Sequence, residues 1–165
     1  NSLLDRKDQI WEGGTISIIP LCEKIVSNAK FRVVAEKYNI AFTYNDSAIQ
    51  IQAKESHIRS VVANLLDNAI KYSPEPAEIK LDIKQNREDV VLTFSDKGIG
   101  INKEHLPKIF DNLYRIPTGN IHNVKGFGLG LSYVKAITNL HNWEIKVNST
   151  PNEGSEFILR IKETL

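Results

Sequence analysis

The spacing of apolar residues switches between two periods along the chain. Within residues 55–72, apolar side chains recur every three or four positions, which is the period of one face of an α-helix. The same spacing predicts helices over residues 20–38, where Pro20 suits the first position, and over residues 128–141. The buried stripe predicted for the central helix consists of Ile58, Val61, Val62, Leu65, Leu66 and Ala69.

Short stretches of strand character lie between the predicted helices. They cover residues 16–19, 40–44, 49–53, 79–84, 90–94, 143–148 and 156–161. Asn45, Asp46 and Ser47 supply turn chemistry, so the second and third strands are predicted to form a hairpin. The order of elements predicts a two-layer α/β sandwich, in which helices cover one face of a mixed, mostly antiparallel sheet.

Composition narrows the class of protein. The 165 residues suffice for one domain, and the formal net charge of +1 names no charged partner. No apolar run approaches the roughly 18 residues that cross a bilayer. The single Cys22 excludes an internal disulfide and a multi-cysteine zinc site. We therefore expect a cytoplasmic domain that neither inserts into a membrane nor binds nucleic acid.

Two details indicate more than a generic domain. The chain starts at Asn1 and contains no Met or leader pattern, so we expect a fragment of a longer protein. Clustered glycines indicate backbone that turns sharply or approaches a ligand closely. Six of the 9 glycines fall in one stretch, at Gly98, Gly100, Gly119, Gly126, Gly128 and Gly130.

The central helix carries an unusual polar face. Asn64, Asn68 and Lys71 follow one another at about one-turn intervals, although Asn is a poor residue for a helix interior. Two interpretations are open. The face is simply solvated, or the amide oxygens bind Mg²⁺ and Lys71 binds a phosphate.

Two other stretches offer matching chemistry. Period-two alternation places Asp96 on the side of the apolar Leu92 and Phe94, where a carboxylate needs a hydrogen-bond donor such as the adenine amine. Gly98 and Gly100 then allow a turn close to a flat ligand, although a purely structural turn explains them equally well. Residues 126–131 place glycine amides before a helix, which suits either an anion site or a hinge.

In this order, these stretches resemble the sequence boxes of the ATP-binding catalytic domain of two-component sensor histidine kinases, within the GHKL ATPase superfamily. Residues 64–73 resemble the N box and residues 96–100 the first glycine box. Residues 109–115 resemble the F box, residues 126–131 the second glycine box, and residues 154–157 the closing strand motif. The five boxes occur in this order and span residues 64–157, which is most of the chain.

The resemblance implies a Bergerat fold that binds ATP and Mg²⁺. It implies that Asn68 coordinates the metal with Asn64 assisting, and that Asp96 binds adenine. Asn64, Lys71 and Arg115 are the implied catalytic residues, the last two acting near the phosphates. The other implied ATP-binding residues are Tyr72, Gly98, Gly100, Ile101, Gly126, Gly128, Leu129, Gly130 and Ser155.

The resemblance also places a flexible ATP lid at about residues 112–127. Leu113 stands where the F box usually has an aromatic residue, and Phe127 is bulky between two glycines. These departures motivate an alternative function, a degenerate GHKL nucleotide sensor without transfer activity. Asn142 replaces the usual glycine after His141, and we expect it to adopt left-handed backbone.

The residue types favour phosphoryl transfer over hydrolysis. ATP-hydrolysing relatives carry a general-base Glu at the position of Asn64, and a neutral amide cannot take a proton from water. The family's phosphoacceptor is a His followed by an acidic residue, a pair that is absent here. Structural or surface roles are expected for His57, His105, His122 and His141, and core packing for Phe110.

The implied reaction therefore needs a partner domain. We expect residues 1–14, with apolar residues such as Leu4 and Trp11 at near-heptad spacing, to be the tail of an upstream dimerisation helix or a linker. Residues 15–165 would be the catalytic domain. The implied partners are the upstream phosphoacceptor domain, a response regulator receiver domain and a second copy of a parent protein that can be anchored in the inner membrane. A serine acceptor would instead indicate an anti-sigma-factor kinase.

Overall fold

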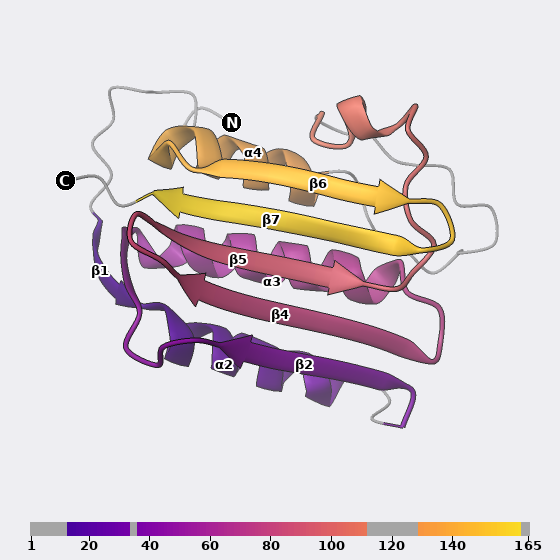
Figure 1. The fold of residues 1–165 in the computed structure, drawn as a ribbon, viewed down its shortest axis with the longest axis horizontal. Helices are drawn as coiled ribbons and strands as arrows, with labels where there is room; N and C mark the ends of the chain where they lie inside the picture. Colours follow the sequence, from indigo (N-terminus) through magenta and orange to yellow (C-terminus); the bar gives the residue numbers. More distant parts are fainter. Residues whose placement is uncertain (1–12, 34–35, 112–128, 163–165) are drawn as a thin grey trace.

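The computed structural model describes residues 13–33, 36–111 and 129–162, which form two layers (Figure 1). Three helices cover one face of a five-stranded sheet, and two short strands pair separately at its margin. These three α-helices are α2 (Ile18–Arg32), α3 (Glu55–Lys71) and α4 (Leu129–His141), and a short 3-10 helix, η1 (Leu106–Lys108), precedes α4 in the chain. The strands are β1 (Gly14–Ser17), β2 (Tyr38–Tyr44), β3 (Gln50–Ala53), β4 (Ala77–Gln85), β5 (Asp89–Asp96), β6 (Glu144–Thr150) and β7 (Gly154–Lys162).

The order of strands in the large sheet is β2-β4-β5-β7-β6. β2 pairs with β4 in parallel, and the other three pairings are antiparallel. The predicted mixed, mostly antiparallel sheet with helices on one face is therefore confirmed. No helix in the described part of the chain is both long and apolar enough to cross a membrane.

The core lies between α3 and the centre of the sheet. All six residues of the predicted apolar stripe of α3 are buried. They pack on the helix-facing side of β4 and β5, where Leu81, Leu92 and Phe94 are almost completely buried. Burying an aliphatic side chain of this size stabilises a fold by roughly 1.5–3 kcal/mol, so this layer fixes the position of α3 and of its polar face.

The predicted hairpin of the second and third strands is wrong. β3 pairs with β1, while β2 pairs with β4, which follows α3 in the chain. Asn45 explains the outcome, because its side chain bonds both the N–H and the C=O of Gln85 at the end of β4. The turn chemistry seen in the sequence therefore extends the β2–β4 ladder, and the Asp46 carboxylate closes its own turn by accepting the N–H of Ala48.

Helix α2 is shorter than predicted and starts earlier. It begins at Ile18, so Pro20 lies inside the first turn, where a missing N–H costs no helical bond. It ends at Arg32, because Val33 is extended and Tyr38 already belongs to β2. The pattern failed here because Val33 and Tyr38 both pack against the core although neither is helical, so their apolar character does not mark the helix end.

The C-terminal end of α4 confirms a local prediction. Asn142 adopts left-handed backbone with φ of 58° directly after the helix. This conformation, which Asn tolerates better than most residues, turns the chain from α4 into β6. Asn142 therefore occupies the left-handed position after the helix that glycine usually occupies.

An aromatic cluster joins the N-terminal end of α3 to this turn. The His141 ring stacks on Trp143 with 4.2 Å between centroids and meets the His57 ring edge-on at 5.2 Å. Burial is the main cause that lowers the pKa of both His57 and His141 below the ordinary 6.5, and the neighbouring His141 and Lys54 lower that of His57 further. Burial therefore favours the neutral form of both rings.

This cluster predicts a pH dependence of stability. The pKa values are lower in the folded state, so the unfolded chain binds more protons as pH falls below 6.5 and the free energy of unfolding decreases. Urea titrations between about pH 7 and pH 5 measure this slope. His57→Gln should flatten the slope, whereas the control His105→Gln, outside the cluster, should keep it. Equal slopes in wild type and His57→Gln would contradict the prediction.

Candidate functional site

The polar face of α3 flanks its buried stripe, on a helix that packs against α4. Asn64 and Asn68 are half-buried and Lys71 is exposed. The Asn64 amide nitrogen donates to the C=O of Ser60 at 2.8 Å, which orients the side chain. Its oxygen lies 3.0 Å from where a side chain on Gly130 would begin. Glycine in the first turn of α4 thus lets the two helices approach at Asn64.

The carboxylate at the end of β5 lies in a partly apolar environment. Asp96 Oδ1 accepts the N–H of Gly98 at 2.9 Å, and the backbone of Ser155 on β7 is a further donor. Burial raises the pKa of Asp96, and these two hydrogen bonds offset only part of that effect. Asp96 therefore has the burial and remaining acceptor capacity to bind a ligand N–H.

The glycine turn after Asp96 packs directly on the end of α3. The N–H of Ile99 donates to the C=O of Tyr72 at 3.1 Å. A Cβ on Gly98 would collide with that same carbonyl oxygen, so only glycine fits. The stretches resembling the N box and the first glycine box, separated in the sequence, therefore form one continuous surface.

A second set of contacts ties the turn to the β6–β7 connection. Gly100 has φ of +72°, and a Cβ there would collide with the backbone of Thr150. The N–H of Ile101 donates to Ser149 Oγ at 2.7 Å, and Ser149 Oγ donates to the C=O of Gly154 at 2.9 Å. Ser149 Oγ also lies 2.8 Å from the hydroxyl of Ser155. These bonds hold Asp96 and Ser155 at one end of the sheet.

Gly100→Ala is therefore expected to reduce the free energy of unfolding by at least about 2 kcal/mol, because it adds left-handed strain to a backbone collision. Chemical denaturation measures the change. Gly14→Ala is the matched control, since a Cβ at Gly14 meets no atom within 4 Å. Equal stability of the two variants would show that the turn is not fixed against Thr150.

The sequence-predicted residues divide into two groups. Within the described residues, one set comes from the C-terminal half of α3, the end of β5 with the turn after it, the start of β7 and the first turn of α4: Asn64, Asn68, Lys71, Tyr72, Asp96, Gly98, Gly100, Ile101, Gly130 and Ser155. Contacts at Gly98, Gly100 and Gly130 link these segments, and the end of β5 lies on the right in Figure 1. The backbone of Leu129 begins α4. Arg115, Gly126, Gly128 and the proposed lid at residues 112–127 lie outside the described residues, as does nearly all of the predicted tail at residues 1–14.

Two serines of the site were not predicted as functional residues. Ser149 has no local signal, because its partner Ile101 is 48 positions away. Ser73 follows the α3 helix directly and is 4% exposed. Its place at the end of a box could have drawn attention to it. Phe110, as predicted, packs against the core, with its ring edge-on to Phe157 at 6.4 Å.

The gathered side chains fit a nucleotide and a hard cation. Asn64 and Asn68 offer amide oxygens, which Mg²⁺ accepts, and Lys71 adds a positive charge at the same end of α3. The buried carboxylate of Asp96 beside the bare backbone of Gly98 suits a flat base with an N–H donor. Among the described residues, no cluster of three His, Cys, Asp or Glu side chains could hold a metal alone. A cation here would share its ligands with a phosphate.

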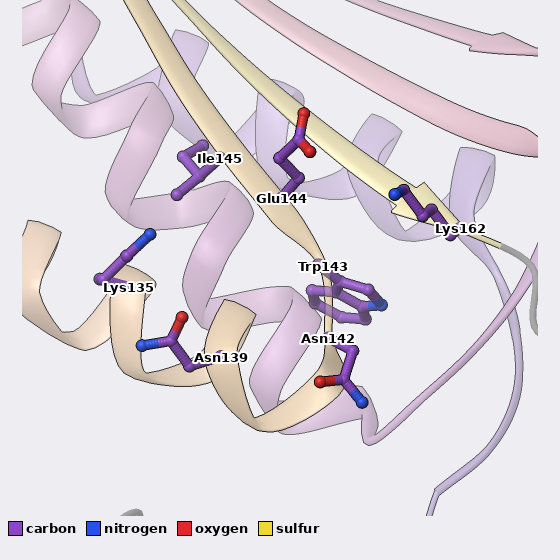
Figure 2. Close-up of a pocket in the computed structure, with 7 residues that line it drawn as sticks. All are labelled: Lys135, Asn139, Asn142, Trp143, Glu144, Ile145 and Lys162. Carbon is purple, nitrogen blue, oxygen red and sulfur yellow. The ribbon is translucent and has the colours of Figure 1, made fainter.

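A hollow at the opposite end of α4 contains none of the predicted site residues. Figure 2 shows its lining side chains, which come from the C-terminal half of α4 and the adjoining ends of β6 and β7: Lys135, Asn139, Asn142, Trp143, Glu144, Ile145 and Lys162. The hollow is open to solvent, and the Trp143 ring in its lining stacks on His141. The predicted site residues therefore lie near the N-terminal end of α4, away from this hollow.

Comparisons with known proteins bear on this arrangement. Residues 53–165 match the family described as histidine kinase-, DNA gyrase B- and HSP90-like ATPase. The sensor protein RprX of Bacteroides fragilis is 43% identical over 135 residues, which are 79% of this chain and 26% of that protein. The sensor histidine kinase WalK of Bacillus subtilis is 31% identical over 98% of this chain and 27% of its own length. The chain thus spans about a quarter of these relatives.

Solved structures share the fold. The nucleotide-free catalytic domain of histidine kinase ThkA superposes with a TM-score of 0.82 at 24% identity, covering 94% of this chain and 100% of that one. Full-length ShkA in complex with AMPPNP superposes with a TM-score of 0.83 at 19% identity, covering 99% of this chain and 34% of that one. At these identities the likeness concerns the fold, and it agrees with the predicted two-layer sandwich.

Proposed function

The chain belongs to the family of histidine kinase-, DNA gyrase B- and HSP90-like ATPases, and we propose that it is the ATP-binding catalytic domain of a two-component sensor histidine kinase. In this proposal it transfers the γ-phosphoryl group of Mg²⁺-bound ATP to a His on an upstream dimerisation and phosphoacceptor domain. The observation that carries the proposal is that the turn after Asp96 packs on the end of the helix that bears Asn64 and Asn68, through the contacts of Gly98 and Ile99 with the Tyr72 carbonyl.

The end of β5 would bind the base. Asp96 keeps acceptor capacity for the adenine amine while the Gly98 amide fixes its orientation. Gly98 lies against the carbonyl of Tyr72 and brings bare backbone to the ligand face. Ile101 and Ser155, tied together through Ser149, would form the side wall of the base site.

The polar face of α3 would serve the phosphates. Asn68, assisted by Asn64, would hold Mg²⁺, which when bound would neutralise phosphate charge. Lys71 and Tyr72 would approach the phosphates from the end of α3, and Gly130 from the first turn of α4. Arg115, Gly126, Gly128 and Leu129 are proposed to complete the phosphate site from the lid and the second glycine box.

Asn64 decides between transfer and hydrolysis. Its amide nitrogen is engaged by the Ser60 carbonyl and its oxygen faces Gly130, so the group is held as a neutral ligand. It cannot take a proton from water, and rapid hydrolysis is disfavoured. Phosphoryl transfer needs mainly positioning of the reactants and neutralisation of the phosphate charge. An imidazole nitrogen of the acceptor His forms the new bond to the γ-phosphorus as the bond to the leaving ADP breaks.

The proposal extends to the parent protein. We propose that residues 1–14 connect to the dimerisation helix, that residues 15–165 form the catalytic domain, and that the parent acts as a homodimer. The phosphoryl group would pass to the receiver domain of a response regulator. The domain would work in the cytoplasm, and its parent protein can be anchored in the inner membrane.

A direct test mixes this chain with the dimerisation and phosphoacceptor segment of its parent, radiolabelled ATP and Mg²⁺. The expected product is acid-labile, base-stable label on histidine that disappears in EDTA. Label on serine would indicate an anti-sigma-factor kinase instead. Tight ATP binding without transfer to the matched segment would indicate a nucleotide sensor and overturn the kinase proposal.

A further inference from the structure

Ser73 is a buried polar residue that the proposed roles leave unused. It follows the last turn of α3, where its N–H lies 3.4 Å from the C=O of Ile70, and the residue is 4% exposed. Its hydroxyl oxygen has no hydrogen-bond partner within the described residues. A buried hydroxyl without a partner destabilises a fold, so such a group needs an explanation.

The surroundings of Ser73 point to the base site. Ser73 Oγ and Asp96 Oδ1 lie 3.0 Å and 2.9 Å from the same point, the position of a side chain on Gly98. The hydroxyl and the carboxylate thus converge on one bare glycine. Asp96 is also incompletely compensated, because burial raises its pKa despite two backbone hydrogen bonds.

The edge of adenine offers the complement to this pair. Beside its amine, which donates to an acceptor such as a carboxylate, adenine carries a ring nitrogen that accepts. A carboxylate can serve only the first, whereas a hydroxyl can donate to the second, directly or through one ordered water. Ser73 supplies the kind of donor that Asp96 lacks.

We infer that Ser73 is a second base-binding residue, whose hydroxyl donates to the ring-nitrogen edge of adenine while Asp96 accepts from the amine. The inference rests on the proposed function, because it concerns the same nucleotide site. Ser73 is satisfied only when the base is bound. Its hydroxyl therefore costs stability in the free domain and contributes affinity in the complex.

Ser73→Ala tests these opposite effects of the hydroxyl on the stability of the free domain and on nucleotide affinity. Isothermal titration should show ADP binding weakened about tenfold, with binding of Mg²⁺-tripolyphosphate, which lacks the base, unchanged. The melting temperature of the free domain should stay equal or rise. Ser73→Cys, which keeps the side-chain volume but donates weakly, should behave similarly. Ser95→Ala is the matched control, since Ser95 adjoins Asp96 but points to the other face of β5.

The outcomes separate the two proposals. Wild-type protein that binds no ADP would refute the nucleotide site itself. Wild-type protein that binds ADP, together with Ser73→Ala that binds it equally well, would refute only the role of Ser73. Ser73→Ala that melts lower with unchanged ADP affinity would assign the hydroxyl a structural role and also overturn the inference.

Discussion

Asp96→Asn is expected to weaken binding of ADP by about 100-fold, the largest effect on affinity of any single change in the described site. The substitution removes the charge that strengthens the hydrogen bond to the adenine amine. It also offers an amide N–H₂ where an acceptor is needed. Isothermal titration of ADP measures the loss, and binding of Mg²⁺-tripolyphosphate should change little because Asp96 serves the base.

The same variant should not damage the free domain. Burial raises the pKa of Asp96 above its ordinary 3.8, so this carboxyl contributes stability below that pH and loses it as pH rises through the folded-state pKa. At neutral pH the ionised carboxylate is a net cost to folding. Asp96→Asn, which can still accept the Gly98 N–H, is therefore expected to unfold at an equal or higher denaturant concentration.

Asp46→Asn is the matched control for this substitution. Asp46 is exposed and accepts the N–H of Ala48 in its turn, a bond that Asn also makes. It should bind ADP as the wild type does. Wild-type affinity in Asp96→Asn would mean that Asp96 is not the base-binding group. A large loss of stability in this variant would mean that Asp96 is a structural residue.

The local pattern of the sequence predicted the supports of this site well. The stripe from Ile58 to Ala69 depends only on helical period, and the left-handed backbone at Asn142 depends only on a helix end. Both features are decided by near neighbours in the chain. Such interactions can be recognised without knowing the rest of the fold.

Pairing between segments that are far apart in the chain could not be predicted from the sequence. The hairpin failed because Asn45 bonds Gln85, 40 positions away, and a local turn signal does not reveal a remote strand. The contact of Gly98 with the Tyr72 carbonyl and the bond from Ile101 to Ser149 are of the same kind. The identities of the site residues could thus be predicted from the sequence. The hydrogen bonds and backbone contacts that orient these residues depend on the topology of the fold.

Asn68→Ala is expected to reduce histidine labelling by about 100-fold or more, because it removes the amide oxygen proposed to hold the metal. Asn68 lies one turn from Asn64 on the half-buried face of α3, away from the stripe that holds the helix to the sheet. The domain should therefore keep its fold, which circular dichroism checks. The more drastic Asn68→Asp should also abolish labelling, by placing a negative charge beside the phosphates.

The metal dependence of ADP affinity isolates this role from binding of the base. Wild-type protein should bind ADP more tightly in Mg²⁺ than in EDTA, while Asn68→Ala should show equal affinity in both and should retain adenosine binding. Asn139→Ala is the control, because Asn139 is an exposed Asn on α4 at the hollow in Figure 2, remote from Asn64. If Asn68→Ala kept the full Mg²⁺ effect, the metal would be held elsewhere. The polar face of α3 would then be a solvated surface without a role in metal binding.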